Sequence, residues 1–346
     1  MSGAGVPAGG AEVGAQANSV ARPSFLLEVR GVTVRYGRLQ ALTDVELGVE
    51  AGELRALVGP DGAGKSTLLR VMAGLQRPTT GRVQRFPGVD RGSGRDAAAL
   101  LGYAGADFDL YSDLTVRENV DFFARLRGMA PGALAAARDR LLELTGLSEA
   151  RNRLAGRLSG GMKKKLSLAT ALVHEPPLLL LDEPTVGVDP ASRRELWDIV
   201  AQANAWGTAV VYSTPYVDEA SRARRLTLLS RGRAVESSPA GLLGQAAGWG
   251  IWVVSLGGER REVRGQLARA GVGPTVYLRP EGLAVVARDG DEARRLATAV
   301  VGGAPALVPG TLTAEDAFVV LDWARAGAGG ADGEPTAGDG REGRRR

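Results

Sequence analysis

The sequence has no cysteine, a single histidine and few aromatic residues, which make up 5% of its 346 positions. The absence of cysteine excludes disulfides and thiolate metal sites. The aromatic residues do not alternate with basic ones in the manner of surfaces that stack nucleobases. We therefore expect no nucleic-acid partner, although the net charge is +4.

Long hydrophobic runs are also missing, since no apolar stretch approaches the roughly 18 residues that span a bilayer. The amino terminus has no charged segment followed by an apolar one, so we predict no signal peptide. An apolar content of 44% and a charged content of 24% are typical of soluble globular proteins, and the length suffices for about two domains. We expect a cytoplasmic chain, so any membrane-spanning part of its function must belong to another subunit.

A phosphate-binding loop is the first chemical signal, because residues 59–66 fit the pattern G-x-x-x-x-G-K-[ST]. A predicted strand, Glu46–Val58, precedes the loop, and a predicted helix, Ser66–Ala73, follows it and stops at Gly74. This order surrounds one anion with backbone N–H groups and the amino terminus of a helix. The predicted binding residues are Gly59, Pro60, Asp61, Gly62, Ala63, Gly64, Lys65, Ser66 and Thr67.

Lysine is scarce, because only four of the 43 basic residues are Lys and the others are Arg. Lys65 is one of the four, and its compact ammonium is predicted to reach the β- and γ-phosphates of a nucleotide. The Ser66 hydroxyl is predicted to bind Mg²⁺. The other three lysines, residues 163–165, predict either a solvated helix face or a place where a docking anion offsets cations at the amino end of a helix.

A buried strand supplies the acidic side of the predicted site. Residues 178–181 are uniformly apolar, as expected for a parallel strand that is covered on both faces. Asp182 follows directly and is predicted to hold Mg²⁺, while Glu183 is predicted to orient or deprotonate an attacking water. These two acids complete a predicted phosphate and metal site.

The third motif, Leu-Ser-Gly-Gly-Met at residues 158–162, stands between the other two. The three motifs in this order resemble the nucleotide-binding subunit of ATP-binding cassette (ABC) transporters, over roughly residues 25–246. The resemblance implies an α/β fold of the P-loop NTPase type with a helical subdomain at about residues 108–160. It also implies that the chain binds ATP and Mg²⁺ and hydrolyses ATP to ADP and phosphate.

The resemblance also assigns roles to single residues. Tyr36 matches the aromatic residue that stacks on adenine in the family. Ser159, Gly160 and Gly161 match the signature residues that close over the ATP of a second cassette in a head-to-tail dimer. Asp189 matches a loop that contacts that second cassette. The implied partners are therefore a second cassette and an integral-membrane permease, which hold the chain at the cytoplasmic face of the membrane.

Two positions depart from the family pattern. Ala106 stands where the family carries a Gln that senses Mg²⁺ and water, and Pro215 stands where it carries a switch His. Proline offers no side-chain donor and no N–H, and the loss of one preorganised contact costs about 10²–10³ in rate. His174 precedes the buried strand and cannot replace the missing His. We therefore expect an impaired catalytic site and a heterodimer with a different, competent cassette. The alternative is slow turnover with substitute residues, namely Asp107, Ser213 or Thr214.

The rest of the chain predicts the domain organisation. Residues 1–24 and 326–346 are rich in glycine and are predicted to be disordered tails. Near-helical apolar spacing predicts a helical insert over residues 115–154. Residues 251–325 predict a βαββαβ unit, a small ferredoxin-like α+β domain that we expect to be regulatory or to stabilise a dimer. Its predicted elements are strands at 251–256, 275–279, 282–288 and 306–309, and helices at 261–270, 291–301 and 313–324.

Two classes of function remain. The first is the energising subunit of an exporter, because residues 114–119 resemble exporters of the drug-resistance and lipid type. The second is a soluble ABC protein that acts on ribosomes or in DNA repair. Those members carry two cassettes or a long coiled-coil insert, whereas this chain has one cassette with about 100 residues between Gly59 and Ser159. A nucleotide-binding regulator without turnover is a variant of either class.

Overall fold

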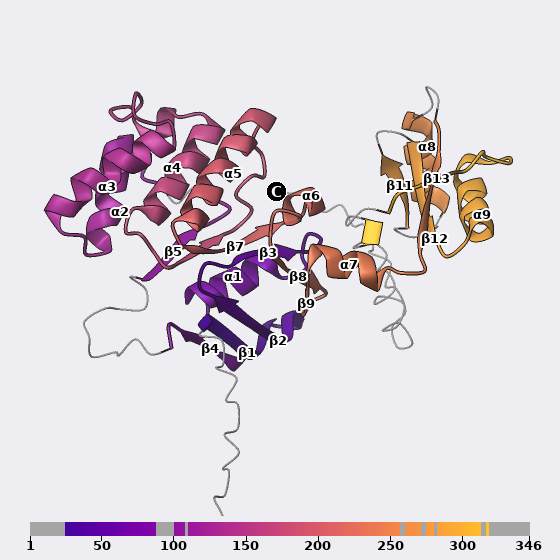
Figure 1. Cartoon of the computed structure of the whole chain (residues 1–346), viewed down its shortest axis with the longest axis horizontal. Helices are drawn as coiled ribbons and strands as arrows, with labels where there is room; N and C mark the ends of the chain where they lie inside the picture. The colour runs from indigo at the N-terminus through magenta and orange to yellow at the C-terminus, as the bar shows by residue number, and fades with distance from the viewer. Residues whose placement is uncertain are drawn as a thin grey trace, which may run out of the picture.

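The computed structural model describes residues 25–87, 100–107, 110–256, 260–270, 275–279, 282–312 and 316–317. Three β-sheets and the helices around them organise these residues (Figure 1). The predicted tails, residues 1–24 and 326–346, lie outside the described part of the chain.

A six-stranded sheet forms the centre of the fold, with the strand order β5-β6-β7-β3-β8-β9. Neighbouring strands pair in parallel as far as β8, and β8 and β9 form an antiparallel hairpin. The four leucines of β6 are all buried, which confirms the strand predicted there. The strands are β3 (Leu54–Val58), β5 (Leu101–Ala104), β6 (Leu178–Leu181), β7 (Ala209–Thr214), β8 (Arg225–Ser230) and β9 (Arg233–Ser237).

A three-stranded antiparallel sheet with the order β2-β1-β4 packs beside the central sheet. The prediction of one strand over Glu46–Val58 is wrong, because a turn divides this segment between the two sheets. Gly52 lies in the turn with φ 66°, a left-handed conformation that glycine adopts without strain. Apolar residues continue on both sides of the turn, so the sequence pattern does not indicate it. The strands are β1 (Phe25–Tyr36), β2 (Leu39–Glu50) and β4 (Thr80–Arg85).

Helix α1 (Lys65–Ala73) lies between these two sheets. It contacts β1 and β2 on one side and β6 and β7 on the other. Leu68, Leu69 and Met72 are fully buried in the core that the helix shares with both sheets. The helix ends at Gly74 in a left-handed conformation, as predicted. The phosphate loop, which precedes α1, is therefore held where the two sheets meet.

A layer of helices covers the opposite face of the central sheet (Figure 1). Helix α4 packs on β5, α5 packs on β7, and α2 and α3 pack on α4. Helix α2 begins with a capping box in which Thr115 and Glu118 each accept the other's backbone N–H. Helices α2 and α3 lie within the predicted helical insert, and residues 145–154 form turns. The helices are α2 (Val116–Leu126), α3 (Pro131–Leu144), α4 (Gly160–Leu172) and α5 (Pro190–Ala205), with the shorter α6 (Val217–Ala220) and α7 (Pro239–Gln245).

The third sheet lies towards the carboxyl end of the chain and has the strand order β11-β12-β10-β13. All its pairs are antiparallel, and with two helices in the order βαββαβ this is the predicted ferredoxin-like arrangement. Most of the helix predicted at residues 313–324 lies outside the described residues. The elements are β10 (Gly250–Val254), α8 (Arg260–Ala270), β11 (Val276–Arg279), β12 (Gly282–Ala287), α9 (Gly290–Val301) and β13 (Val308–Gly310).

The chain returns to the main core after β13. Leu312 packs against both the core of the central sheet and a small apolar cluster of the third sheet. Ala317 is fully buried in the same core cluster as Ala246. Asp316, which is also buried, forms an ion pair with Arg279 of β11. The last described residues therefore tie the third sheet to the rest of the fold.

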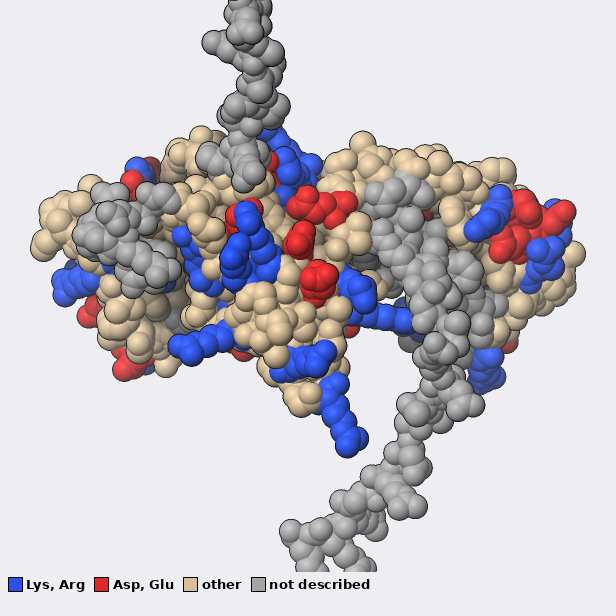
Figure 2. Space-filling model, turned by 90° about the horizontal axis from the view of Figure 1, so that it is seen from below, with Lys and Arg blue, Asp and Glu red and all other residues tan. Residues whose placement is uncertain are grey.

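The surface carries charges of both signs. Figure 2 shows basic and acidic side chains interspersed over one face of the molecule. Among the helices that the structure describes, none is both long and apolar enough to cross a membrane.

Candidate nucleotide site

The predicted phosphate loop borders a cavity of about 490 Å³. Gly62 and Gly64 adopt φ values of 79° and 107°, which glycine tolerates and other residues do not. A Cβ on Gly64 would lie 2.6 Å from the carbonyl oxygen of Ala41, so the loop packs closely against β2. The predicted residues that line the cavity include Tyr36, Asp61, Lys65, Ser66, Thr67 and Glu183.

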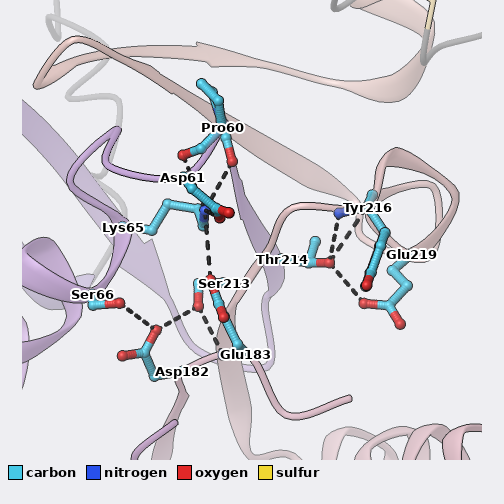
Figure 3. Close-up of polar contacts among 11 residues, drawn as sticks. Pro60, Asp61, Lys65, Ser66, Asp182, Glu183, Ser213, Thr214, Tyr216 and Glu219 are labelled. Carbon is cyan, nitrogen blue, oxygen red and sulfur yellow. Dashed lines mark hydrogen bonds and ion pairs between the residues drawn. The ribbon is translucent and has the colours of Figure 1, made fainter. Parts of the chain in front are cut away.

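Lys65 opens helix α1, and only 4% of its side chain is exposed. Its Nζ donates a hydrogen bond to the carbonyl oxygen of Gly59 at 2.8 Å. It also donates to that of Pro60 at 3.2 Å (Figure 3). Glu183 Oε1 lies 3.6 Å from this nitrogen and Asp61 Oδ1 lies 3.9 Å from it. The ammonium thus stands between the loop and the acid. Phosphate oxygens can replace the two carbonyls as its partners and form stronger, charge-assisted bonds.

Asp182 follows β6 and is fully buried. Its Oδ1 accepts hydrogen bonds from Ser66 Oγ at 2.9 Å and from Ser213 Oγ at 2.7 Å (Figure 3). Its Oδ2 has no hydrogen-bond partner among the described residues. A buried carboxylate oxygen without a partner is costly, and Mg²⁺ prefers oxygen ligands such as carboxylates and hydroxyls. The side chains of Ser66 and Asp182 therefore fit a Mg²⁺ ion.

Glu183 adopts φ 48°, a left-handed conformation that costs a residue other than glycine on the order of 1–3 kcal/mol. Its N–H donates to Ser213 Oγ at 2.9 Å, and the same hydroxyl donates to Asp182. Ser213 thus connects Asp182, the predicted Mg²⁺ ligand, with Glu183, which is predicted to orient the attacking water. From the sequence, Ser213 was only a possible substitute donor, because its contacts depend on how β6 and β7 pair.

Lys164, within the lysine run at residues 163–165, has a place that sequence analysis missed. The residue lies in α4 and is only 8% exposed, so it does not belong to a solvated helix face. Its Nζ donates to the carbonyl oxygens of Ala106 at 2.8 Å and of Glu183 at 3.4 Å. Both acceptors are backbone atoms of distant segments, so no residue pattern could have revealed these contacts.

Tyr36 ends β1 at the rim of the cavity and is 48% exposed. Its hydroxyl donates to Gln76 Oε1 at 2.7 Å, which fixes the orientation of the ring. Arg231 and Gly232, at the tip of the β8–β9 hairpin, line the same cavity. The Gly232 N–H donates to the carbonyl oxygen of Ala63 at 3.2 Å, so the tip is tied to the phosphate loop. Nothing in the motif pattern pointed to this hairpin.

The signature residues Ser159, Gly160 and Gly161 lie at the start of α4 and do not line the cavity at the phosphate loop. Ser159 Oγ caps the helix by accepting the N–H of Met162 at 3.3 Å. A Cβ on Gly161 would lie 2.5 Å from Ser192 Oγ, so α4 and α5 approach closely here. The motif therefore presents a helix amino terminus outside the site formed by Lys65.

Asp189 caps helix α5 within the chain. Its Oδ1 accepts the N–H groups of Ala191 and Ser192, each at 3.0 Å, and its Oδ2 accepts the Ser192 hydroxyl at 2.7 Å. These bonds, with the Ser192 N–H contributing most, lower the pKa of the Asp189 carboxyl. Pro190 occupies the first helical position, where its missing N–H costs nothing. Asp189 thus fixes the start of α5, next to the signature residues.

The segment around Pro215 is held by a buried carboxylate, Glu219. Thr214 Oγ1 donates to Glu219 Oε2 at 2.7 Å, and the Tyr216 N–H donates to Thr214 Oγ1 at 3.0 Å (Figure 3). Glu219 also accepts a hydrogen bond from Thr185 Oγ1 at 2.6 Å. The Thr214 hydroxyl is therefore engaged with Glu219 rather than with the phosphate loop.

His174 lies before the amino end of β6, whereas Asp182 follows its carboxyl end. The two residues thus lie beyond opposite ends of the strand. Burial, with a smaller effect from the positive charge of Arg127, lowers the pKa of His174 to about 4. The ring is neutral at neutral pH and takes no part in the site.

Comparison with known proteins places these motifs in a family. Residues 42–186 match the family model of the ABC transporter. The probable multidrug ABC transporter ATP-binding protein YbhF of Escherichia coli is 46% identical over 210 residues, which are 60% of this chain but 36% of YbhF. The chain thus spans little more than a third of that relative. The daunorubicin/doxorubicin resistance ATP-binding protein DrrA of Streptomyces peucetius is 35% identical over 276 residues, 78% of this chain and 82% of DrrA. The Nod factor export ATP-binding protein I of Neorhizobium galegae is 36% identical over 218 residues, 63% of each chain.

Solved structures share the fold of the cassette. An ATP-binding subunit of an ABC transporter superposes with a TM-score of 0.58 at 29% identity, over 64% of this chain and 92% of the other. A dimeric ATP-binding cassette in a post-hydrolysis state, bound to ADP and Pi, has a TM-score of 0.54 at 26% identity, over 61% of this chain and 98% of the other. Since DrrA aligns with this sequence over most of both chains, the chain belongs to the ABC transporter ATPase family.

Proposed function

We propose that this chain is the ATP-binding and ATP-hydrolysing subunit that powers export through a separate membrane permease. The observation that carries the proposal is the convergence of Lys65, Ser66 and Glu183 at one cavity, with Asp182 hydrogen-bonded to Ser66 behind it. Relatives named for drug resistance and for Nod factor export support the exporter class. In this proposal the chain lies at the cytoplasmic face of the membrane, attached to the permease.

The residues around the cavity have separate tasks in binding ATP. Backbone N–H groups of the phosphate loop and the amino terminus of α1 bind the β- and γ-phosphates. The Lys65 ammonium exchanges its two carbonyl partners for phosphate oxygens, and the Tyr36 ring stacks on adenine. Ser66 and Asp182 hold Mg²⁺, which when bound neutralises charge on the β- and γ-phosphate oxygens.

Hydrolysis then needs a water molecule in line with the bond that breaks. Glu183 accepts a hydrogen bond from this water, or its proton, as the oxygen attacks the γ-phosphorus. The bond from phosphorus to the ADP oxygen breaks, and the products are ADP and inorganic phosphate. Lys65 stabilises the negative charge on the transferred phosphoryl group, because it already lies beside both the loop and Glu183.

A second cassette completes the proposed sites. Because the signature residues lie outside the cavity of their own chain, we propose that they act on the nucleotide of the partner cassette. The site of this chain lacks side-chain donors at Ala106 and Pro215, so the proposed partner is a different cassette with a competent site. The residues of this chain that serve the partner's nucleotide are Ser159, Gly160, Gly161 and Asp189.

The division of labour between the sheets is also a proposal. Residues 25–246 act as the cassette, and residues 251–325 regulate it or stabilise the dimer. A chain that ends after Ala246 should bind ATP with unchanged affinity. It should also unfold at a lower temperature, because Leu312 and Ala317 no longer pack against the main core. Loss of ATP binding in the folded, truncated chain would contradict this division.

The nucleotide site is tested by binding of a fluorescent ATP analogue to the full chain. Lys65→Ala should abolish binding, whereas Lys165→Ala, which breaks an ion pair with Glu195 outside the cavity, should leave it unchanged. Thermal unfolding of both variants shows whether they remain folded. Unchanged affinity in folded Lys65→Ala would refute the site.

The asymmetric pair is tested by ATP turnover. The isolated chain should hydrolyse ATP slowly. In a complex with the partner cassette and the permease, Ser159→Arg should reduce turnover more than Glu183→Gln does, because Ser159 serves the competent site. Brisk hydrolysis by the isolated chain that Glu183→Gln abolishes would overturn the proposed impairment. Binding of ATP without hydrolysis at either site would instead favour a nucleotide-binding regulator.

A further inference from the structure

Three segments of the chain meet at the Lys164 ammonium. Lys164 belongs to α4, Ala106 follows β5, and Glu183 follows β6. The Nζ donates to the carbonyl oxygen of Ala106 at 2.8 Å and to that of Glu183 at 3.4 Å. A single side chain therefore links the signature helix to the turn after β5 and to the Glu183 turn, which borders the phosphate site.

The turn at Glu183 needs such support. Its φ of 48° is unfavourable for a residue with a side chain, and such a conformation persists only where the surroundings hold it. Its N–H is held by Ser213 Oγ at 2.9 Å, and its carbonyl oxygen is held by Lys164. The two bonds act on opposite ends of the same residue, so they set the direction in which its carboxylate leaves the backbone.

The turn at Ala106 needs support for a different reason. The alanine side chain has no polar atom with which to contact the phosphate site. Ala106 can therefore be held by other side chains only through its backbone, and Lys164 holds its carbonyl oxygen with the shorter of its two bonds. Ala106 lacks the side-chain amide of the family's Gln, and the turn is instead held through its backbone by Lys164.

The chemistry of Lys164 suits this task. A buried lysine is unusual unless its charge is compensated. Burial lowers the pKa of Lys164, while the negative charges of Asp182, Glu183 and Asp107 act in the opposite direction. The ammonium carries three donors on a flexible stem, so it can bond two carbonyl oxygens that no helix or strand pairing would join.

We propose that Lys164 is a positioning residue for ATP hydrolysis, which joins the signature helix to the Ala106 loop and the Glu183 turn and so fixes the Glu183 carboxylate beside the phosphate loop. This inference rests on the proposed function. It has a mechanical consequence, since a displacement of α4 is passed directly to Glu183. Contact of Ser159, at the start of α4, with the partner cassette is thereby coupled to the water-orienting residue of this chain's own site.

The link itself is tested by amide hydrogen exchange in the full chain without nucleotide. Lys164→Met keeps the length of the stem and removes the ammonium. We expect the amides of residues 105–107, 182 and 183 to exchange at least about 10-fold faster, since an opened turn loses its hydrogen bonds. Lys165→Met is the matched control, because its ion pair with Glu195 joins α4 to α5 and touches neither turn. It should leave these amides unchanged.

The effect on the reaction is tested by single-turnover hydrolysis with saturating ATP and Mg²⁺. Lys164→Met should lower the rate about 10²-fold, as expected for a small displacement of a catalytic group. The dissociation constant for ATP should change by less than about 3-fold, because the phosphate loop is untouched. Lys164→Arg, which keeps a buried cation with several donors, should restore at least a tenth of the wild-type rate.

The outcomes separate the two proposals. Unchanged exchange at both turns in folded Lys164→Met would refute the link, whatever the turnover. If the wild-type chain binds ATP but does not hydrolyse it, hydrolysis fails as a function while the exchange experiment still decides the link. Should Lys164→Met not fold, Lys164→Gln, which keeps an N–H donor group but removes the charge, takes its place in both measurements. Equal losses in ATP affinity and in rate would show a merely structural role and overturn the proposal.

Discussion

Replacement of Ser213 by alanine removes one buried hydroxyl that serves both acids of the site. The Ser213 Oγ donates to the charged Asp182 Oδ1 at 2.7 Å and accepts the Glu183 N–H at 2.9 Å. A hydrogen bond to a charged group contributes about 1.5–3 kcal/mol and a neutral one about 0.5–1.5 kcal/mol. Removal of this one oxygen leaves little empty space, so the resulting void adds little to the loss of stability. We expect Ser213→Ala to lower the free energy of unfolding by about 2–4 kcal/mol.

Urea unfolding of the full chain measures this loss. Ser230→Ala, at the partly exposed end of β8, is the matched control and should cost less than about 0.5 kcal/mol. In an Asp182→Asn background the cost of Ser213→Ala should fall by about 1 kcal/mol or more, because the charged acceptor is gone. The two changes are in direct contact, so additivity of their effects would contradict the bonding described here.

The same substitution separates binding from hydrolysis. Ser213 does not line the cavity, so ATP affinity should fall by less than about 10-fold, which corresponds to about 1.4 kcal/mol. The Glu183 turn loses the bond to its N–H, so single-turnover hydrolysis should fall about 10²-fold. A stability loss below about 0.5 kcal/mol together with an unchanged rate would refute the reasoning, because both effects follow from the same two bonds.

Further predictions concern four other positions. Because burial lowers the pKa of His174 to about 4 from an ordinary value of 6.5, the unfolded chain binds a proton that the folded chain does not. The free energy of unfolding should therefore decline as the pH falls from about 6.5 to about 4. In urea unfolding at pH 7.5 and 5, His174→Gln should remove up to about 2 kcal/mol of that decline. Tyr36→Ala should weaken ATP binding about 10-fold by calorimetry while Tyr36→Phe retains affinity, as expected for stacking on adenine. Gly64→Ala should abolish ATP binding, because its Cβ would lie 2.6 Å from a carbonyl oxygen, whereas Gly62→Ala, with open space around its Cβ, should keep weak binding. Equal losses of ATP affinity in the two glycine variants would show that the backbone conformation, and not the close contact at Gly64, determines the effect.

The residues that a linear motif specifies were predictable from sequence. The phosphate loop, the strand before Asp182 and the small βαββαβ unit each depend on spacing within one stretch of chain. Lys65, Ser66 and Glu183 accordingly lie where their motifs predict, around one cavity. The motif roles that involve a second cassette stay predictions, since they concern contacts beyond this chain.

The residues that connect the motifs were not predictable. Ser213 and Arg231 reach the site because β7 and the β8–β9 hairpin lie beside it in space, and Lys164 reaches the Glu183 turn because α4 packs beside that turn. Their partners are backbone atoms or residues of other elements, and such contacts leave no periodic signal. The turn at Gly52 was missed for a related reason, because apolar residues on both sides of it face cores of different sheets.

The burial of Ala317 beside Ala246 has a consequence for the order in which the protein assembles during synthesis. A nascent chain emerges from its amino end, so the segments around the phosphate loop leave the ribosome first. The core on the helical face of the central sheet is completed only when Leu312 and Ala317, which follow the whole third sheet, have also emerged. A chain that is interrupted within the third sheet therefore lacks these residues, although its nucleotide motifs are already in place. The apolar residues that they would cover stay exposed, and the quality-control machinery can recognise them.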